Sequence, residues 1–262
     1  MRLTFLGSCS GTEPMPGRMH TAYVIEHDGG VYWFDAGEGC SHTAHVSGID
    51  LFAVRAVFVT HPHIDHTGGL ANLIWTMEKL QGRYASGDRN LEGKTVPVFI
   101  PSLSVWEGAL AVAGAPADRF DPPFTVDGRT YTDGTIFDDG CVRVIARHNT
   151  HLGEPESGKP WQAYSFRIEA AGKVFVTSGD IGHVSELGDF LDGCDLFIME
   201  TGHHKVEDVC TYLCDTNVNV GKLGFFHHGR AILEDAAAEL SKAQRMLGPD
   251  VFIAEDGMSV DV

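Results

Sequence analysis

The sequence is poor in basic residues. Lysine and arginine number 19 against 36 acidic residues, which gives a formal net charge of −17 at pH 7. Proteins that grip nucleic acid need a positive surface, because phosphate neutralisation supplies most of that affinity. The charge therefore argues against a polynucleotide partner and an anionic membrane surface, although a bound dication would still attract small anions.

Other features are also missing. No apolar run reaches the length of a membrane span, and the first residues, MRLTFLGS, lack the pattern of a signal peptide. The six cysteines include no CxxC pair, which is typical of buried thiols in a reducing compartment. We find no linker, low-complexity tract or short repeat. We therefore expect a cytoplasmic protein that folds as one domain over residues 1–262.

The apolar pattern predicts strands alternating with helices. Stretches typical of strands cover residues 2–7, 21–37, 54–60, 96–102, 141–149, 162–179, 194–200, 221–227 and 250–256. Helical spacing covers residues 39–48, 68–81, 102–114, 183–193, 205–217 and 231–247. Each half of the chain has a hairpin followed by alternation. This order predicts an α/β fold with two sheets stacked face to face and helices outside.

One short segment gathers metal-ligand side chains. Residues 60–69, THPHIDHTGG, hold three histidines and one aspartate directly after a predicted strand. In an extended segment His61 and His63 point the same way and can bind one ion. The chain then turns into a helix, so Asp65 and His66 can reach a neighbouring ion. Neutral imidazole and carboxylate suit zinc, iron or manganese.

Other predicted strands end in residues of the same types. Asp180 follows VTSG, and His227 and His228 end the stretch LGFFHH. His148 lies at the end of the strand predicted over residues 141–149, and His151 follows it. Open α/β sheets place their sites at the carboxyl ends of strands, so we expect these residues to complete a pair of metal sites.

The motif HPHIDHTGG resembles the HxHxDH signature of the metallo-β-lactamase superfamily of dinuclear hydrolases. The order of FDAGEG, this motif, a lone histidine, SGD and a terminal histidine is similar to that family over about residues 3–257. The resemblance implies a four-layer αββα sandwich with two divalent metals at the edge of the sheets, zinc first and manganese or iron as alternatives. GSCSGTEPMPGR and GHHK resemble the branch that includes the tRNA 3′-processing endonuclease and its phosphodiesterase relatives.

The resemblance implies seven metal ligands. They are His61, His63, Asp65, His66, His151, Asp180 and His227. The first ion takes two motif histidines and His151, with His148 as the alternative, by analogy. The second ion takes the rest of the motif and His227, which leaves His228 as a pocket residue or a satisfied polar side chain. Asp180 bridges both ions.

The implied chemistry is hydrolysis by a hydroxide that bridges the metals and attacks an ester-like bond. Asp65 would orient the hydroxide while ligating. His203, in GHHK, is placed like a histidine that looks catalytic in phosphodiesterase members. We predict that His203 is a general acid or oxyanion stabiliser, with a surface histidine at a helix start as the alternative. Asp35, in FDAGEG, is expected to brace the ligand loop without ligating.

The substrate prediction depends on charge and on an expected insertion. The tRNA-processing members carry a basic arm that holds tRNA, and we see no such insertion; residues 80–94 are short and mix both charges. We therefore expect a small phosphodiester and no nucleic acid, with a lactone, thioester or sulfate ester as alternatives. A non-catalytic metal-dependent sensor is the other class. Trp75, Tyr84 and Trp161 are candidate pocket walls, and a homodimer is the usual assembly of this branch.

Overall fold

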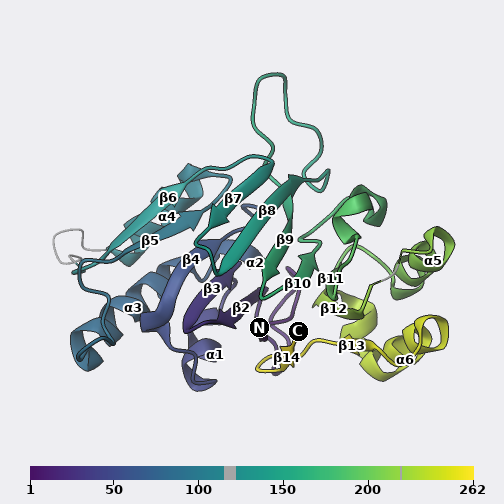
Figure 1. Ribbon diagram of the computed structural model, residues 1–262, viewed down its shortest axis with the longest axis horizontal. Helices are drawn as coiled ribbons and strands as arrows, with labels where there is room; N and C mark the ends of the chain where they lie inside the picture. The colour runs from purple at the N-terminus through teal and green to yellow at the C-terminus, as the bar shows by residue number, and fades with distance from the viewer. Residues whose placement is uncertain (115–121, 219) are drawn as a thin grey trace.

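The computed structural model describes residues 1–114, 122–218 and 220–262. Within these residues the strands form two seven-stranded sheets (Figure 1). The first sheet runs in the order β14 (Ser259–Asp261), β1 (Arg2–Gly7), β2 (Ala22–His27), β3 (Gly30–Phe34), β4 (Val54–Phe58), β5 (Thr95–Phe99) and β6 (Thr125–Arg129). The second runs β13 (Val251–Ile253), β12 (Lys222–His228), β11 (Leu196–Thr201), β10 (Lys173–Thr177), β9 (Tyr164–Ala170), β8 (Val142–His148) and β7 (Gly134–Asp138).

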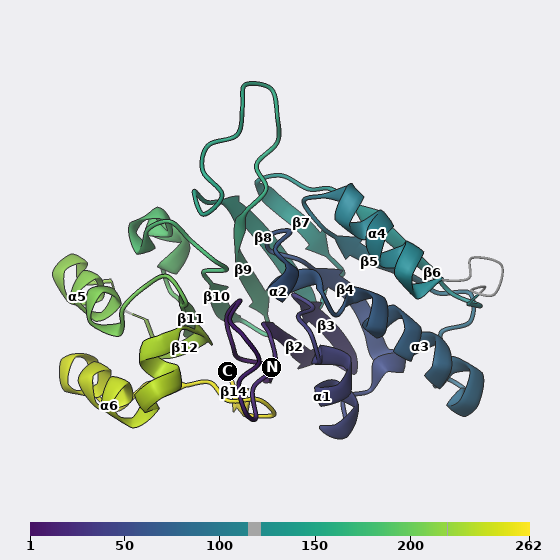
Figure 2. The ribbon, with the colours of Figure 1, turned by 180° about the vertical axis from the view of Figure 1, so that it is seen from behind.

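Helices cover the outer face of each sheet. Figures 1 and 2 show α1 (Cys40–Val46), α3 (Leu70–Tyr84) and α4 (Leu103–Ala113) along the first sheet. Helices α5 (Val206–Thr216) and α6 (Arg230–Leu247) lie along the second. The short elements are α2 (Ile64–Thr67) and the 3-10 turns η1 (Leu51–Ala53), η3 (Val184–Glu186) and η4 (Gly188–Leu191). The predicted αββα sandwich is confirmed.

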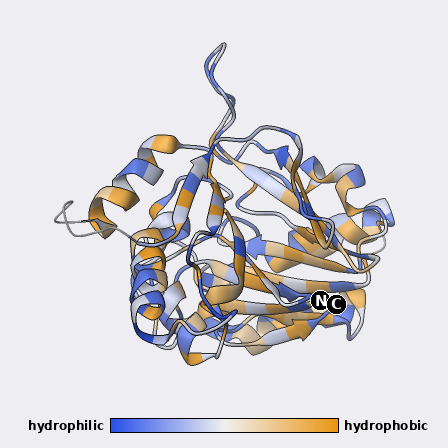
Figure 3. Ribbon diagram, turned by 60° about the vertical axis from the view of Figure 1, so that its left-hand side comes forward, coloured by the Kyte–Doolittle hydropathy of each residue, from blue (hydrophilic) through white to orange (hydrophobic). Residues whose placement is uncertain are grey.

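The central strands are apolar on both faces because each sheet is covered twice. Phe34 and Phe58 point between the sheets, whereas their neighbours Trp33 and Val57 point towards the helices. The rings of Phe34 and Phe58 stack at 4.9 Å, and Phe166 of the second sheet meets Phe58 at 6.3 Å. Figure 3 shows this apolar character as orange along the strands. Alternate residues of one strand therefore pack into two different cores, one between the sheets and one under the helices.

The differences from the predicted elements are local. The strands β6, β7 and β14 were not predicted, and each lies at the edge of its sheet. Edge strands bury little surface, and β6 has no fully buried residue, so they leave a weak apolar pattern. The helix predicted for residues 183–193 is wrong. That segment forms η3 and η4, and Gly188, the first residue of η4, has φ 44°, outside the helical range.

The sheet directions bring several strand ends to one place. Strands β3 to β6 run parallel to one another, and so do strands β10 to β13. The loop between β8 and β9, residues 149–163, projects far from the body of the molecule (Figures 1 and 2). Residues that directly follow β4, β8 and β10 meet at its base, together with the end of β12.

Candidate metal centre

Two groups of ligand-type atoms lie side by side at these strand ends. The first consists of His61 Nε2, His63 Nδ1, His151 Nε2 and Asp180 Oδ2. The nitrogen of His63 lies 3.1 Å from that of His61 and 3.3 Å from that of His151. The Asp180 oxygen lies 3.6 Å from the His61 nitrogen and 3.7 Å from the His151 nitrogen. One carboxylate oxygen and three ring nitrogens therefore converge.

The second group uses the other oxygen of Asp180. His66 Nε2 and His227 Nε2 lie 3.4 and 3.3 Å from Asp180 Oδ1. Asp65 Oδ2 lies 3.5 Å from the same His66 nitrogen and 3.1 Å from the same His227 nitrogen. The structure thus brings all seven predicted ligands together, and the position of Asp180 between the groups is that of a bridging residue. Their roles as ligands stay a prediction.

The donor set fits divalent metal ions. His66 Nε2 and Asp180 Oδ1 are buried and have no hydrogen-bond partner among the described residues. An unpaired buried polar atom costs about 1–3 kcal/mol, and a cation between these atoms would satisfy both. The three converging ring nitrogens of the first group cannot all be hydrogen-bonded to one another. Histidine nitrogen and carboxylate oxygen suit zinc, manganese and iron.

Burial and charge act in opposite directions on these groups. Burial lowers the pKa of His61 well below its usual value. Burial also lowers the pKa of His227, but the Asp180 and Asp65 carboxylates outweigh it and raise that pKa to about 9. The same histidine holds the pKa values of both carboxyls below their usual value despite burial. In the ion-free protein His227 therefore carries a proton, which a metal ion must displace.

A buried carboxylate braces the second group. Asp35 accepts a hydrogen bond from the Thr60 backbone N–H at 2.7 Å, and His66 Nδ1 lies 2.9 Å from its other oxygen. Asp35 has φ 52°, a conformation that aspartate tolerates better than most residues. Thr60 Oγ1 bonds the same carboxylate and lies 3.1 Å from His61 Nδ1. Asp35 thus lies where the sequence predicted a brace. The part played by Thr60 was missed, and its only signal is its place directly before the motif.

A β-bulge aims His227 at the site. In the pairing of β12 with β11, Phe226 faces Glu200 and His228 faces Thr201, so His227 is the extra residue. Its φ is 50°, rare for a histidine within a strand. His228 is fully buried, with Nε2 2.8 Å from the Ala254 carbonyl oxygen. Of the two predicted roles for His228, a pocket residue or a satisfied polar side chain, the structure therefore shows the second.

Two glycines make room for the ligands. Gly179, before Asp180, has φ 56°, and a Cβ there would lie 2.6 Å from the Tyr164 carbonyl oxygen. A Cβ on Gly202 would lie 2.6 Å from His227 Nδ1. Neither position accepts a larger residue without displacing its neighbours. The SGD and GHHK patterns include Gly179 and Gly202, but the sequence alone did not show that either glycine makes room for a ligand.

His203 lies beside the two groups and is held by Glu200. Its Nδ1 is 3.3 Å from Glu200 Oε1 and 3.7 Å from Asp180 Oδ2, and its backbone N–H donates to Glu200 Oε2 at 2.9 Å. The hydrogen bond to Glu200 raises the pKa of His203. The side chain is 46% exposed, so solvent or a substrate can reach it. Glu200 is itself buried and also accepts from His204 Nδ1 at 2.7 Å.

His148, the last residue of β8, and His151 lie in different environments. His151 joins the first group, and its backbone N–H donates to Asn149 Oδ1 at 3.1 Å. His148 instead lies 2.6 Å from Asp133 Oδ2 through Nδ1, and its ring stacks on Trp161 at 4.1 Å. Only His151 is therefore placed as a ligand. The sequence did not indicate either supporting residue. Asp133 contacts a histidine fifteen residues away, and the contact of Asn149 with the His151 N–H depends on the shape of the loop.

The other two candidate pocket walls lie on α3. Trp75 and Tyr84 are 48% and 58% exposed. The Lys79 ammonium lies 5.3 Å from the centre of the Trp75 ring. Their role as pocket walls stays a prediction.

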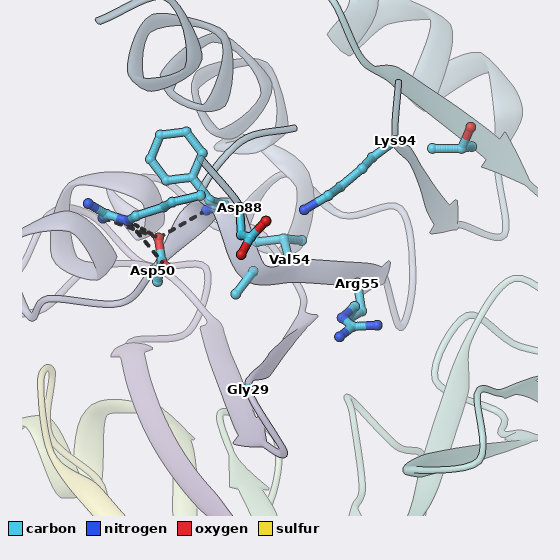
Figure 4. Close-up of a pocket in the computed structure, with 10 residues that line it drawn as sticks. Gly29, Asp50, Val54, Arg55, Asp88 and Lys94 are labelled. Atoms are coloured by element: carbon cyan, nitrogen blue, oxygen red, sulfur yellow. Dashed lines mark hydrogen bonds and ion pairs between the residues drawn. The ribbon is translucent and has the colours of Figure 1, made fainter. Parts of the chain in front are cut away.

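A cavity of about 650 Å³ lies away from these groups (Figure 4). It is lined by Val54 and Arg55 at the start of β4 and by Lys94 before β5. On one wall Arg89 pairs with Asp50 at 3.2 Å. The cavity lies at the start of β4, whereas the ligand motif follows the end of β4. The cavity is therefore at the opposite end of this strand and is not part of the metal site.

Among the described residues, no helix is both long and apolar enough to cross a membrane.

Comparison with known proteins identifies the family. The model described as "Beta-lactamase superfamily domain" matches residues 32–248. The chain belongs to this family. Its structure is similar to human tRNase Z, short form, with a TM-score of 0.71 and 19% identity over 100% of this chain and 99% of the other. At that identity the similarity concerns the fold, which for this β-lactamase-superfamily protein agrees with the sandwich described above.

Curated relatives of the chain include several named ribonuclease Z. The protein of that name from Anoxybacillus flavithermus is 32% identical over 175 residues, which cover 64% of this chain and 48% of the relative. The chain thus spans about half the length of that relative, and less of some others. The ribonuclease Z of Shouchella clausii is 29% identical over 322 aligned residues, 98% of this chain and 95% of the relative. The predicted superfamily is confirmed, and the names of these relatives agree with the predicted branch.

These relatives correct the predicted partner. The net charge and the lack of a basic insertion predicted a small-molecule ester as the substrate and no nucleic acid. That prediction is wrong, because the relatives are named for action on RNA. The physical error lies in using net charge, −17 for the whole chain, as a measure of one local site. A pair of bound dications attracts phosphate at the place of reaction whatever the sum over the remaining surface.

Proposed function

We propose that this protein is a dinuclear metal-dependent phosphodiesterase that cleaves RNA, with tRNA precursors as the substrate class. The observation that carries the proposal is the pair of ligand groups that share Asp180, one oxygen to each. The relatives named ribonuclease Z support RNA as the polymer. The same groups support two ions, with zinc as the preferred metal because histidine supplies most of the donors.

The ligand assignment follows the two groups. His61, His63 and His151 would hold one ion, Asp65, His66 and His227 the other, and Asp180 both. Bound divalent ions supply Lewis acidity: they polarise a phosphoryl oxygen and make water acidic enough to act as a nucleophile near neutral pH. A carboxylate shared by both groups would hold two ions close together, where they could stabilise the attacking and the leaving oxygen of a displacement at phosphorus.

The protein's own residues supply the proton transfers. Asp65, whose Oδ2 belongs to the second group, orients the attacking water and accepts its proton. His203 donates a proton from Nε2 to the leaving ribose oxygen, because its Nδ1 is directed to Glu200. Glu200 also lies 3.7 Å from His227 Nδ1, so one buried carboxylate lies close to both the acid and a ligand. This assigns Asp65 and His203 as catalytic residues.

Two further predictions belong with this function. We infer one hydrolase domain over residues 1–262, supported by the pairing of β14 with β1 and by ligands that span residues 61 to 227. We also infer a cytoplasmic location, supported by six free cysteines, as is usual for a reducing compartment.

The test is cleavage of a tRNA precursor with a 3′ extension by purified protein of known metal content. We expect cleavage that stops on chelation and returns with zinc or manganese. Asp180→Asn should abolish it, and His203→Ala should slow it about 10²–10⁴-fold, the usual contribution of a general acid. Asp192→Asn and His45→Ala change exposed residues of the same types and are the matched controls. A protein with full metal occupancy that cleaves no RNA would favour a metal-dependent binding module instead.

A further inference from the structure

The rings of His148 and Trp161 form a rigid, half-exposed surface. They stack at 4.1 Å with 20° between their planes. Trp161 packs against the core between the two sheets, whereas the His148 side chain is 36% exposed. The imidazole is therefore the outer ring of the pair. Trp161 covers one face of the imidazole, so the exposed surface of His148 belongs to the rest of its side chain.

Both rings are anchored from other elements. Asp133 holds His148 twice, through the backbone N–H at 2.6 Å and through Nδ1 at 2.6 Å. The Trp161 carbonyl accepts from the Tyr164 hydroxyl at 3.2 Å, and the next side chain, Gln162, donates to the Pro101 carbonyl at 3.2 Å. An aromatic surface that is already ordered loses little side-chain entropy when a ligand binds.

The pair lies next to the metal centre. His148 is three residues before His151, so their Cα atoms are at most about 11 Å apart. Stacked nucleotides are spaced by roughly 3.4 Å along a strand. A base on His148 therefore belongs to a nucleotide within about three positions of the bond held at the ligand groups.

We propose that His148 and Trp161 form a stacking platform for an unpaired nucleobase of the RNA beside the cleaved bond, an inference that rests on the proposed function. Single-stranded bases stack on aromatic rings with little sequence preference. Stacking also adds affinity without positive charge, which suits a chain with a net charge of −17. Neither residue reaches the reacting atoms, so the platform positions the strand and is not catalytic.

The test is a binding cycle between protein and RNA variants. The probe is a fluorescein-labelled RNA hairpin with a single-stranded 3′ extension and a methylene phosphonate at the cleavage junction, bound by the zinc-loaded protein. Abasic nucleotides replace, one at a time, the three positions on each side of the junction. We expect His148→Ala to weaken binding about 5- to 100-fold, the range for loss of one base stack. His148→Phe keeps an aromatic ring and should bind within about threefold of wild type, as should the exposed control His45→Ala.

The cycle separates the two proposals. An abasic site at the stacking position should weaken wild-type binding and add no further loss in His148→Ala. Losses that add at every position, or a His148→Ala protein that binds like wild type, would overturn the platform even if the unmodified RNA is cleaved. Coupled losses together with no cleavage of the unmodified RNA would support the platform and contradict the proposed function.

Discussion

The substitution Asp35→Asn tests how the second ligand group is held. Asp35 accepts from the Thr60 N–H at 2.7 Å and lies 2.9 Å from His66 Nδ1. His66 can ligate through Nε2 only if Nδ1 carries the proton, so Nδ1 needs an acceptor. Asparagine has one acceptor oxygen, and its amide hydrogens face either the Thr60 N–H or the His66 N–H, whichever way it turns. Asparagine tolerates the φ of 52°, so the backbone can stay as it is.

Two donors that face each other in a buried site leave one bond unmade, which costs about 1–3 kcal/mol. Because 1.4 kcal/mol is tenfold in affinity, this agrees with the 10- to 100-fold loss typical when the partner of a ligating histidine is removed. We expect that loss for one of the two ions, measured by competition with a chromophoric chelator. Asp192→Asn, at an exposed position, should leave both affinities unchanged.

Urea unfolding of the metal-free proteins shows whether Asp35→Asn still folds cooperatively. A folded Asp35→Asn protein with both metal affinities within about twofold of wild type would refute the reasoning. In that case the proton on His66 is not controlled by Asp35, and the short contact between them has no influence on ligation.

Further predictions concern the ligands and the core. His151→Ala should lower the metal content towards one ion per chain, whereas His148→Ala should leave it unchanged, as elemental analysis would show; equal content in both would contradict the assignment. Gly202→Ala should weaken the second ion more than tenfold, because its Cβ would lie 2.6 Å from His227 Nδ1, and an unchanged chelator titration would count against this. Affinity for that ion should fall at least about tenfold per pH unit below 9, because the Asp180 carboxylate raises the pKa of His227 to about 9 and also raises that of His66, and their protons must leave before the ion binds; a flat profile from pH 8 to 6 would disprove it. Phe58→Ala should lower the free energy of unfolding by about 3–5 kcal/mol in urea titrations, because its ring is fully buried, and a loss below about 1 kcal/mol would contradict the packing described.

Part of the metal centre could be predicted because it is local. His61, His63, Asp65 and His66 lie within one turn of chain after β4, and their order alone indicates two neighbouring ions. The end of an apolar strand then marked Asp180 as a further candidate. These residues can be predicted without knowing any distant contact, because the carboxyl ends of parallel strands lie together along one side of the sheet.

The choice between neighbouring histidines could not be made this way. His148 ends β8 and His151 comes three residues later. Asp133, fifteen residues before His148, contacts the His148 ring, which does not join the ligand groups. His227 and His228 are adjacent, and the bulge alone turns His227 to the metal site. A one-residue change in strand register reverses which side chain faces the site, and no local pattern records it.

The amino-acid sequence by itself determined the layers of this protein and the kinds of atoms at its centre, because burial periodicity and ligand type are properties of single segments. Tertiary structure alone decided which histidine completes each group, that Asp180 divides its oxygens between the groups, and that Glu200 lies beside both His203 and His227. These depend on distances between segments far apart in the chain, which follow from sheet register and packing.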